Sequence, residues 1–118
     1  MSDLEKEIKA AGADKAPRIT PDHIEAVIVA ENYFTAAQGV QGATPVGLRT
    51  TVPHPSLKLL TLCVLVLENG FTVTGESACA SPENFNVDIG RRIARENAVE
   101  KVWLLEGYRL KQKLYASQ

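Results

Sequence analysis

The chain has 118 residues, 45% of them apolar, so it is long enough for one hydrophobic core and too short for two independent domains. Its 13 Lys and Arg residues balance 14 Asp and Glu residues, which excludes a global field that would draw the protein onto nucleic acid or an anionic membrane. The longest apolar stretch, Leu59 to Leu67, is far shorter than the roughly 20 residues of a membrane-spanning helix. The first residues lack the basic and then apolar order of a secretory signal, so we expect a cytoplasmic protein with reduced cysteines.

The beginning of the chain divides into an arm and a folded part. Residues 1 to 19 mix small and charged types around Pro17, which predicts a flexible helical arm and leaves residues 20 to 118 as a single domain. Thr20 and Pro21 then supply an N-cap and a proline at the first helical position. Apolar residues recur along one stripe after them and predict a helix from 21 to 37, ended by Gly39; the stripe comprises Ile24, Val27, Ile28 and Phe34.

The middle of the chain carries the signals of a loop and a β-hairpin. Residues 39 to 56 contain three glycines and three prolines, which predicts a long loop with a short edge strand at Leu48 to Val52. The dipeptide Asn69-Gly70 lies between two β-like runs and predicts a hairpin with a type I′ turn, which needs positive φ at both central residues. One face of the second strand is expected to be buried, with Phe71 and Val73 on it and Thr72 and Thr74 on the other.

A long helix is predicted for the carboxy-terminal part. Ser81 and Pro82 repeat the cap-and-proline start, and Gly107 is expected to break the helix before a final turn. Trp103 is expected to be largely buried, under the sheet or in a subunit interface. The predicted buried stripe comprises Phe85, Ile89, Ile93, Ala98, Val102 and Leu105.

These elements predict an α+β fold in which a small antiparallel sheet, built on the central hairpin, packs with an N-terminal helix and a long C-terminal helix. Two or three strands under two helices bury little apolar area. We therefore expect the protein to form a homo-oligomer.

The residue types that usually carry catalysis form no recognisable constellation. His23 and His54 belong to no metal-ligand spacing, and Cys63 and Cys79 form no paired motif. Cys79 precedes a predicted helix, whose dipole favours a thiolate, yet no motif ties a general base to it. We expect no catalytic residue, no metal and no cofactor, and hence a binding protein that is not an enzyme.

Basic residues crowd the beginning of the long helix. Arg91 and Arg95 are four positions apart, so their guanidinium groups share a face and can converge on one phosphate. Positive charge there is opposed by the helix dipole, and a bound anion would relieve that conflict. The alternative is a solvated helix face whose charges pair locally, as Arg92 can with Glu96. The predicted ligand-binding residues are Arg91, Arg92, Arg95, Asn84, Phe85 and Asn86, with Arg109 and Lys113 as a second basic pair.

Several blocks of sequence match a known family in order. They include Asn69 to Cys79, Pro82 to Phe85, Gly90 to Ala94 and Val102 to Tyr108, together with Ile19 to Ile24. Over roughly residues 19 to 110 the chain resembles the gene-forty-nine family of small tailed-phage proteins. That resemblance implies a phage or prophage origin and a non-structural accessory role.

A second resemblance is to the phage sponge proteins that counter Thoeris immunity. It implies an oligomeric counter-defence protein that sequesters a nucleotide-derived signal, such as a cyclic ADP-ribose isomer or a cyclic oligonucleotide, without hydrolysing it. The alternative is a protein-binding inhibitor of a host enzyme or defence factor, which an edge strand open to β-augmentation would favour. Binding to nucleic acid is not expected, because the basic residues are few.

Overall fold

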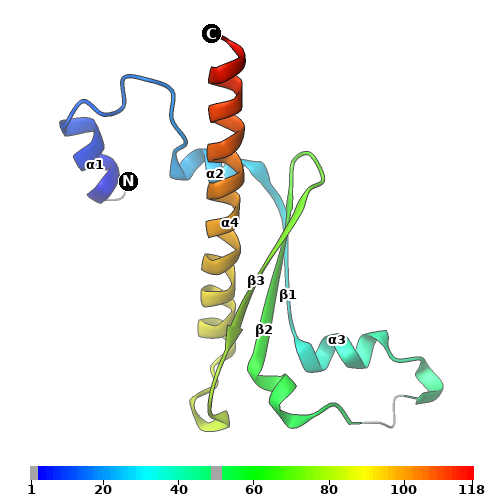
Figure 1. The fold of residues 1–118 in the computed structure, drawn as a ribbon. Coiled ribbons are helices and arrows are strands. Elements are labelled where there is room, and N and C mark those ends of the chain that lie inside the picture. The colour runs from blue at the N-terminus through cyan, green and yellow to red at the C-terminus, as the bar shows by residue number, and fades with distance from the viewer. Residues whose placement is uncertain (1–2, 49–51) are drawn as a thin grey trace.

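A computed structural model describes residues 3–48 and 52–118 of the chain and shows the expected α+β fold (Figure 1). Three strands form one antiparallel sheet in the order β1-β2-β3, and the long helix α4 lies along one face of it. The helices and strands are α1 (Asp3–Ala10), α2 (Pro21–Val27), β1 (Ile28–Thr35), α3 (Ala36–Ala43), β2 (Leu60–Leu67), β3 (Thr72–Ala78) and α4 (Val87–Ala116). The short 3-10 turns are η1 (Val46–Leu48), η2 (Pro55–Leu59) and η3 (Pro82–Asn84).

The segment predicted as one helix from 21 to 37 is instead a helix, a strand and part of a second helix. The predicted start is confirmed, because the Thr20 side chain caps α2 by accepting a hydrogen bond from the His23 N–H at 3.1 Å. After Val27 the sequence is rich in β-branched and aromatic residues, which suit a pleated strand, and β1 pairs with β2 along its length. Gly39 does not end a helix but lies within α3. Pairing with a neighbouring strand therefore overrides the helical spacing of this segment.

The loop after α3 differs from the prediction in the part that is described. Leu48 is the last residue of the 3-10 turn η1 and does not begin a strand. The prediction of an edge strand starting at Leu48 is therefore wrong at that residue. Residues 49–51, the centre of that expected strand, lie outside the described residues. The chain then enters β2 through η2, whose first turn is capped by the His54 side chain.

The hairpin at Asn69-Gly70 is confirmed, but its turn is not type I′. Among the described residues positive φ is confined to glycines, and in this turn only Gly70 has it, at 88°. The Gly70 N–H donates to the Leu67 carbonyl and the Leu67 N–H donates to the Phe71 carbonyl, both at 2.8 Å. One left-handed residue closing a longer connection is typical of a turn that ends in a bulge.

The burial predicted for the second strand is right for Val73 and wrong for Phe71. Val73 is buried, while Thr72 and Thr74 point to the other face. Phe71 is 54% exposed, because it precedes β3 at the tip of the hairpin, which projects away from α4 (Figure 1).

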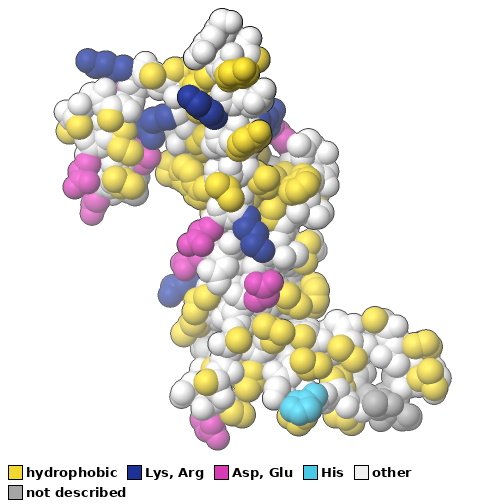
Figure 2. All heavy atoms as spheres, viewed as in Figure 1, with side chains coloured by type: hydrophobic (Ala, Val, Ile, Leu, Met, Phe, Trp, Pro, Cys, Tyr) yellow, Lys and Arg dark blue, Asp and Glu magenta, His cyan; other side chains and the backbone are white. Residues whose placement is uncertain are grey.

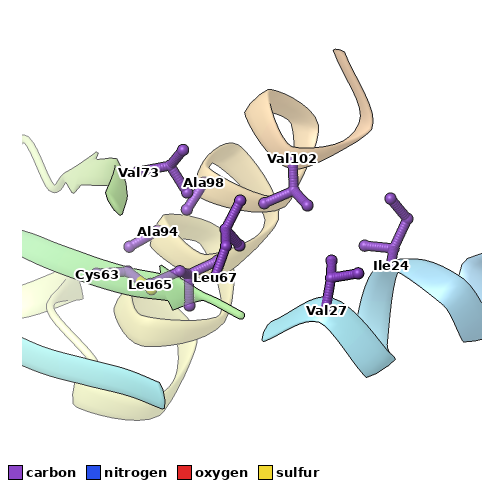
Figure 3. Close-up of a cluster of buried hydrophobic side chains, with 9 residues drawn as sticks. All are labelled: Ile24, Val27, Cys63, Leu65, Leu67, Val73, Ala94, Ala98 and Val102. Carbon is purple, nitrogen blue, oxygen red and sulfur yellow. The ribbon is translucent and has the colours of Figure 1, made fainter. Parts of the chain in front are cut away.

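The core lies between α4, α2 and the sheet (Figure 3). Small residues at every fourth position of α4, namely Gly90, Ala94 and Ala98, face the sheet together with Val102. Of the predicted stripe, only Ala98 and Val102 are buried; Ile89, Ile93 and Leu105 are exposed and Phe85 precedes the helix. The sheet and the helix approach so closely that small side chains fill the contact, which displaces the larger residues to the flanks.

The carboxy-terminal end of α4 continues past the sheet (Figure 1). Gly107 lies inside the helix and does not break it. Trp103 is 38% exposed, so the prediction that the sheet buries it is wrong for the single chain.

The Cα radius of gyration is 18.7 Å, whereas a compact chain of this length has about 13 to 14 Å. No helix within residues 3–48 and 52–118 has the length and apolar content needed to cross a membrane.

Candidate ligand-binding site

Arg91 and Arg95, near the start of α4, both contact side chains of other elements of the protein. Both terminal nitrogens of Arg95 donate to the carboxylate of Glu25, at 3.1 and 2.7 Å, and its Nε donates to Glu31 at 3.3 Å. These bonds join α4 to α2 and to β1. The hydrogen bonds to Glu25 and the nearby carboxylate of Glu31 raise the pKa of Arg95. Arg95 therefore holds three elements together and is not presented as an open anion site.

Arg91 lies on the same flank as Arg95, as the spacing predicted. Its guanidinium carbon stands 5.6 Å from the centre of the Tyr33 ring, within the range of a cation–π contact. The Tyr33 hydroxyl donates to Glu31 at 2.5 Å, and this bond is the main cause that lowers the pKa of Glu31. Arg92 is exposed on the outer side of the helix.

The residues expected to complete the arginine site lie elsewhere. Asn84, Phe85 and Asn86 line a cavity of about 160 Å³ together with Ile89 and Ile93. Residues two positions apart point in nearly opposite directions on a helix, so this cavity and Arg91 and Arg95 occupy opposite flanks of α4. Asn86 has a structural task there, because its side chain accepts from the Ile89 N–H and caps α4. The structure therefore does not bring the predicted aromatic and the predicted arginines together.

The second basic pair borders a separate cavity. Arg109 and Lys113, one turn apart on α4, line a space of about 170 Å³ between that helix and the start of α2. The other residues that line it are Ile19, His23, Glu68, Glu106 and Leu110. We call this the α2–α4 cavity.

A buried carboxylate organises the α2–α4 cavity. Glu106 is only 5% exposed, and its Oε1 lies 2.9 Å from Nε2 of His23. The same oxygen lies 3.6 Å from an Arg109 nitrogen, which is also 3.7 Å from Glu68 of the hairpin turn. The cavity thus gathers an imidazole, a guanidinium, an ammonium and two carboxylates from three parts of the chain.

His23 and Glu106 are functional candidates that the sequence did not reveal as a pair. They lie 83 positions apart, and no motif links them. One signal existed for Glu106, which follows Val102 at the four-residue spacing of the buried face of α4. A charged residue on such a face needs a partner, because burying an unpaired charge is costly.

Among the described residues, no group of three or more His, Cys, Asp or Glu side chains is placed to hold a metal ion.

Comparison with curated proteins found no significant match, and neither did comparison with solved structures. A family model described as "Phage protein (N4 Gp49/phage Sf6 gene 66) family" matches residues 19–114. This match spans α2, the sheet and nearly all of α4, including every residue of the α2–α4 cavity. The chain therefore belongs to the N4 Gp49/phage Sf6 gene 66 family of phage proteins.

Proposed function

We propose that the protein is a phage accessory protein that binds a small nucleotide-type ligand at the α2–α4 cavity and releases it unchanged. The observation that carries this proposal is the position of Arg109 and Lys113 beside His23 at one cavity. Arg and Lys side chains are suited to phosphate, and an imidazole N–H can add a further donor. The family supports a phage origin, and the counter-defence role comes from the resemblance to sponge proteins.

The carboxylates of the cavity suit the sugar of such a ligand. Glu and Asp side chains accept hydrogen bonds from ribose hydroxyls in many nucleotide sites, and Glu68 and Glu106 stand on the same cavity as the cations. A ribose phosphate offers both a diol and an anion. The cavity of about 170 Å³ is smaller than the roughly 300 Å³ or more of a typical pocket for a whole drug-sized ligand. It therefore suits the sugar–phosphate part of a nucleotide, with the base lying outside.

Calorimetric titration tests this proposal with AMP, ADP-ribose, cyclic ADP-ribose and cyclic dinucleotides as probes. At least one should bind, and Arg109→Ala or Lys113→Ala should weaken it by roughly ten- to a hundredfold, as expected for a lost charge-assisted hydrogen bond. Arg92→Ala is the matched control, because Arg92 is an exposed cation of the same helix outside the cavity. Mass spectrometry of the released probe should show it intact. Equal binding by all variants, or binding by none of the probes, would contradict the proposal.

A second candidate is a protein-binding inhibitor, which the two outer strands of the sheet favour. In the order β1-β2-β3 each of β1 and β3 pairs on one side only among the described strands. A peptide can add to such an edge through backbone hydrogen bonds. Val29, at the bulge of β1, is 61% exposed beside one edge. Co-purification of a host protein that is lost on Val29→Pro, with the nucleotide probes inactive, would favour this candidate.

A further inference from the structure

The α2–α4 cavity combines cations that attract a phosphate with a buried carboxylate that repels it. Arg109 and Lys113 line the cavity, and the Arg109 side chain is 64% exposed, so an anion from solvent can reach it. Figure 2 shows Lys and Arg side chains at the surface of the carboxy-terminal end of α4. Glu106, on the same helix, is only 5% exposed. An ionised carboxylate at this depth opposes a nearby phosphate, so a ligand of that kind needs a further positive charge in the cavity.

The fixed charges of the cavity do not supply that further charge. The charged side chains that line it are Arg109 and Lys113 of α4, Glu106 of the same helix and Glu68 of the hairpin turn. One Arg109 nitrogen stands 3.6 Å from Glu106 and 3.7 Å from Glu68, so a single guanidinium is shared between two carboxylates. Two cations and two carboxylates cancel before any ligand enters. A bound phosphate therefore leaves the cavity with an excess of negative charge unless His23 changes its charge.

His23 is placed to take up a proton without losing its contact with Glu106. Its Nε2 lies 2.9 Å from Oε1 of Glu106. Neutral imidazole and imidazolium can both donate an Nε2–H to that oxygen, and the added proton goes to Nδ1. Within residues 3–48 and 52–118 no hydrogen bond of the chain occupies Nδ1 of His23, and the side chain is 42% exposed. Histidine is also the side chain whose ordinary change of charge falls between about pH 5 and pH 8.

We propose that the His23–Glu106 pair takes up a proton when a phosphate-bearing ligand enters the α2–α4 cavity, so that the site holds this ligand more tightly as the pH falls. The inference rests on the proposed function and adds the regulation of that site. The proton belongs to the pair, whichever of the two side chains carries it. Proton and ligand raise each other's affinity by the same factor. Because the bound state holds more protons than the free state, affinity rises with falling pH and levels off where the free pair is already protonated.

Calorimetric titration of the full chain in two buffers measures this proton uptake. ADP-ribose and a cyclic dinucleotide are the probes, because their phosphate groups keep a constant charge over the pH range used. Tris and PIPES at about pH 7 differ in their heat of ionisation, so a difference between the observed heats counts the protons taken up. The wild type should take up as much as one proton per ligand. Its affinity should be roughly five- to a hundredfold higher at about pH 6 than at about pH 8.

His23→Gln and His54→Gln make the same substitution inside and outside the cavity. Glutamine at position 23 keeps an amide donor for Glu106 and cannot take up a proton. His23→Gln should therefore bind the probe with equal heats in both buffers and with little dependence on pH. His54 caps η2 and does not line the cavity, so His54→Gln should keep the proton uptake of the wild type. A pair that only joins α2 to α4 would not produce this difference between the two variants.

Each alternative result overturns a different statement. Binding by the wild type with equal heats in both buffers overturns the proton uptake and leaves the proposed function standing. Proton uptake that persists in His23→Gln overturns the role of the pair. If neither probe binds at any pH, the proposed function and this inference both fail. If circular dichroism shows that His23→Gln does not fold, Glu106→Gln replaces it, because its amide oxygen still accepts from Nε2 of His23 while the buried charge is gone. Its proton uptake should fall below that of the wild type, and full uptake would overturn the inference.

Discussion

Gly75 of β3 lies directly against the backbone of Ala94 in α4. A Cβ atom on residue 75 would stand 2.1 Å from the Ala94 carbonyl oxygen and 2.4 Å from the Ala98 nitrogen. Both neighbours are backbone atoms of a regular helix, so they cannot move aside as a flexible side chain would. This contact sets how closely the sheet and α4 approach, and it explains why small residues occupy the centre of the core.

Gly75→Ala is therefore expected to destabilise the fold severely. Inserting a methyl group into a packed core commonly costs about 1 to 3 kcal/mol, and the backbone contacts place this substitution at or above the upper end. Urea denaturation followed by circular dichroism should show a much lower midpoint or no cooperative transition. A midpoint within experimental error of the wild type would show that β3 and α4 do not approach so closely.

Gly107→Ala should have the opposite effect and serves as a matched control for Gly75→Ala. Gly107 is an exposed residue inside α4, and nothing lies within 4 Å of the position of its missing Cβ. Glycine in a helix interior costs about 0.5 to 1 kcal/mol relative to alanine, so the free energy of unfolding should rise by that amount. An unchanged or lower free energy would indicate that the helix is not continuous at this position.

The carboxylate of Glu31 should make the fold sensitive to acid. The hydrogen bond from Tyr33, together with the charge of Arg95, lowers the pKa of Glu31 below its ordinary value. A carboxylate whose folded pKa is depressed stabilises the fold above its unfolded pKa, about 4.3, and this contribution is lost as the pH falls through the folded pKa. Stability should therefore decline below about pH 4.3.

Glu31→Gln isolates this effect. The variant should be less stable than the wild type at pH 7, and the difference between the two should shrink as the pH falls. Urea midpoints measured from pH 7 to pH 3 check this. Parallel curves for the two proteins would mean that Glu31 does not titrate differently in the folded and unfolded states.

Local signals were sufficient for part of the fold. The cap at Thr20 and the hairpin at Asn69-Gly70 are formed by neighbouring residues, so the sequence predicts them directly. Strand β1 was missed because its apolar residues also satisfy a helical spacing, and only the partner strand β2, more than 25 positions away, decides between the two. The burial of Gly90 and Ala94 was missed for a related reason, since side-chain size is informative only when the distance to the sheet is known.

The candidate site also combines residues that local sequence patterns predicted with residues that only the folded chain brings together. Arg109 and Lys113 were predicted as a pair, because one turn of a helix joins them. Their neighbours His23 and Glu106 meet through the packing of α2 on α4, which no local pattern reports. The sequence likewise could not assign Arg95 to Glu25, 70 positions away.

Arg95→Ala should reduce stability, in contrast to the expectation for a solvated cation opposed by the helix dipole. The Arg95 side chain is 27% exposed and makes a two-bond contact with Glu25 and a third bond with Glu31. Removing it leaves two acidic residues of α2 and β1 without their shared partner. Because Glu25 is itself 58% exposed, solvent screens part of the interaction, and the expected loss is about 1 kcal/mol.

Arg92→Ala is the control within the same turn and should change stability by less than about 0.5 kcal/mol, as is usual for an exposed surface position. Urea denaturation of both variants at low and high salt measures the difference, which should shrink as salt screens the pairs. Equal stability of Arg95→Ala and Arg92→Ala would mean that the contacts of Arg95 do not hold α4 to α2 and β1 in solution, and Arg95 would then be available to bind an anion.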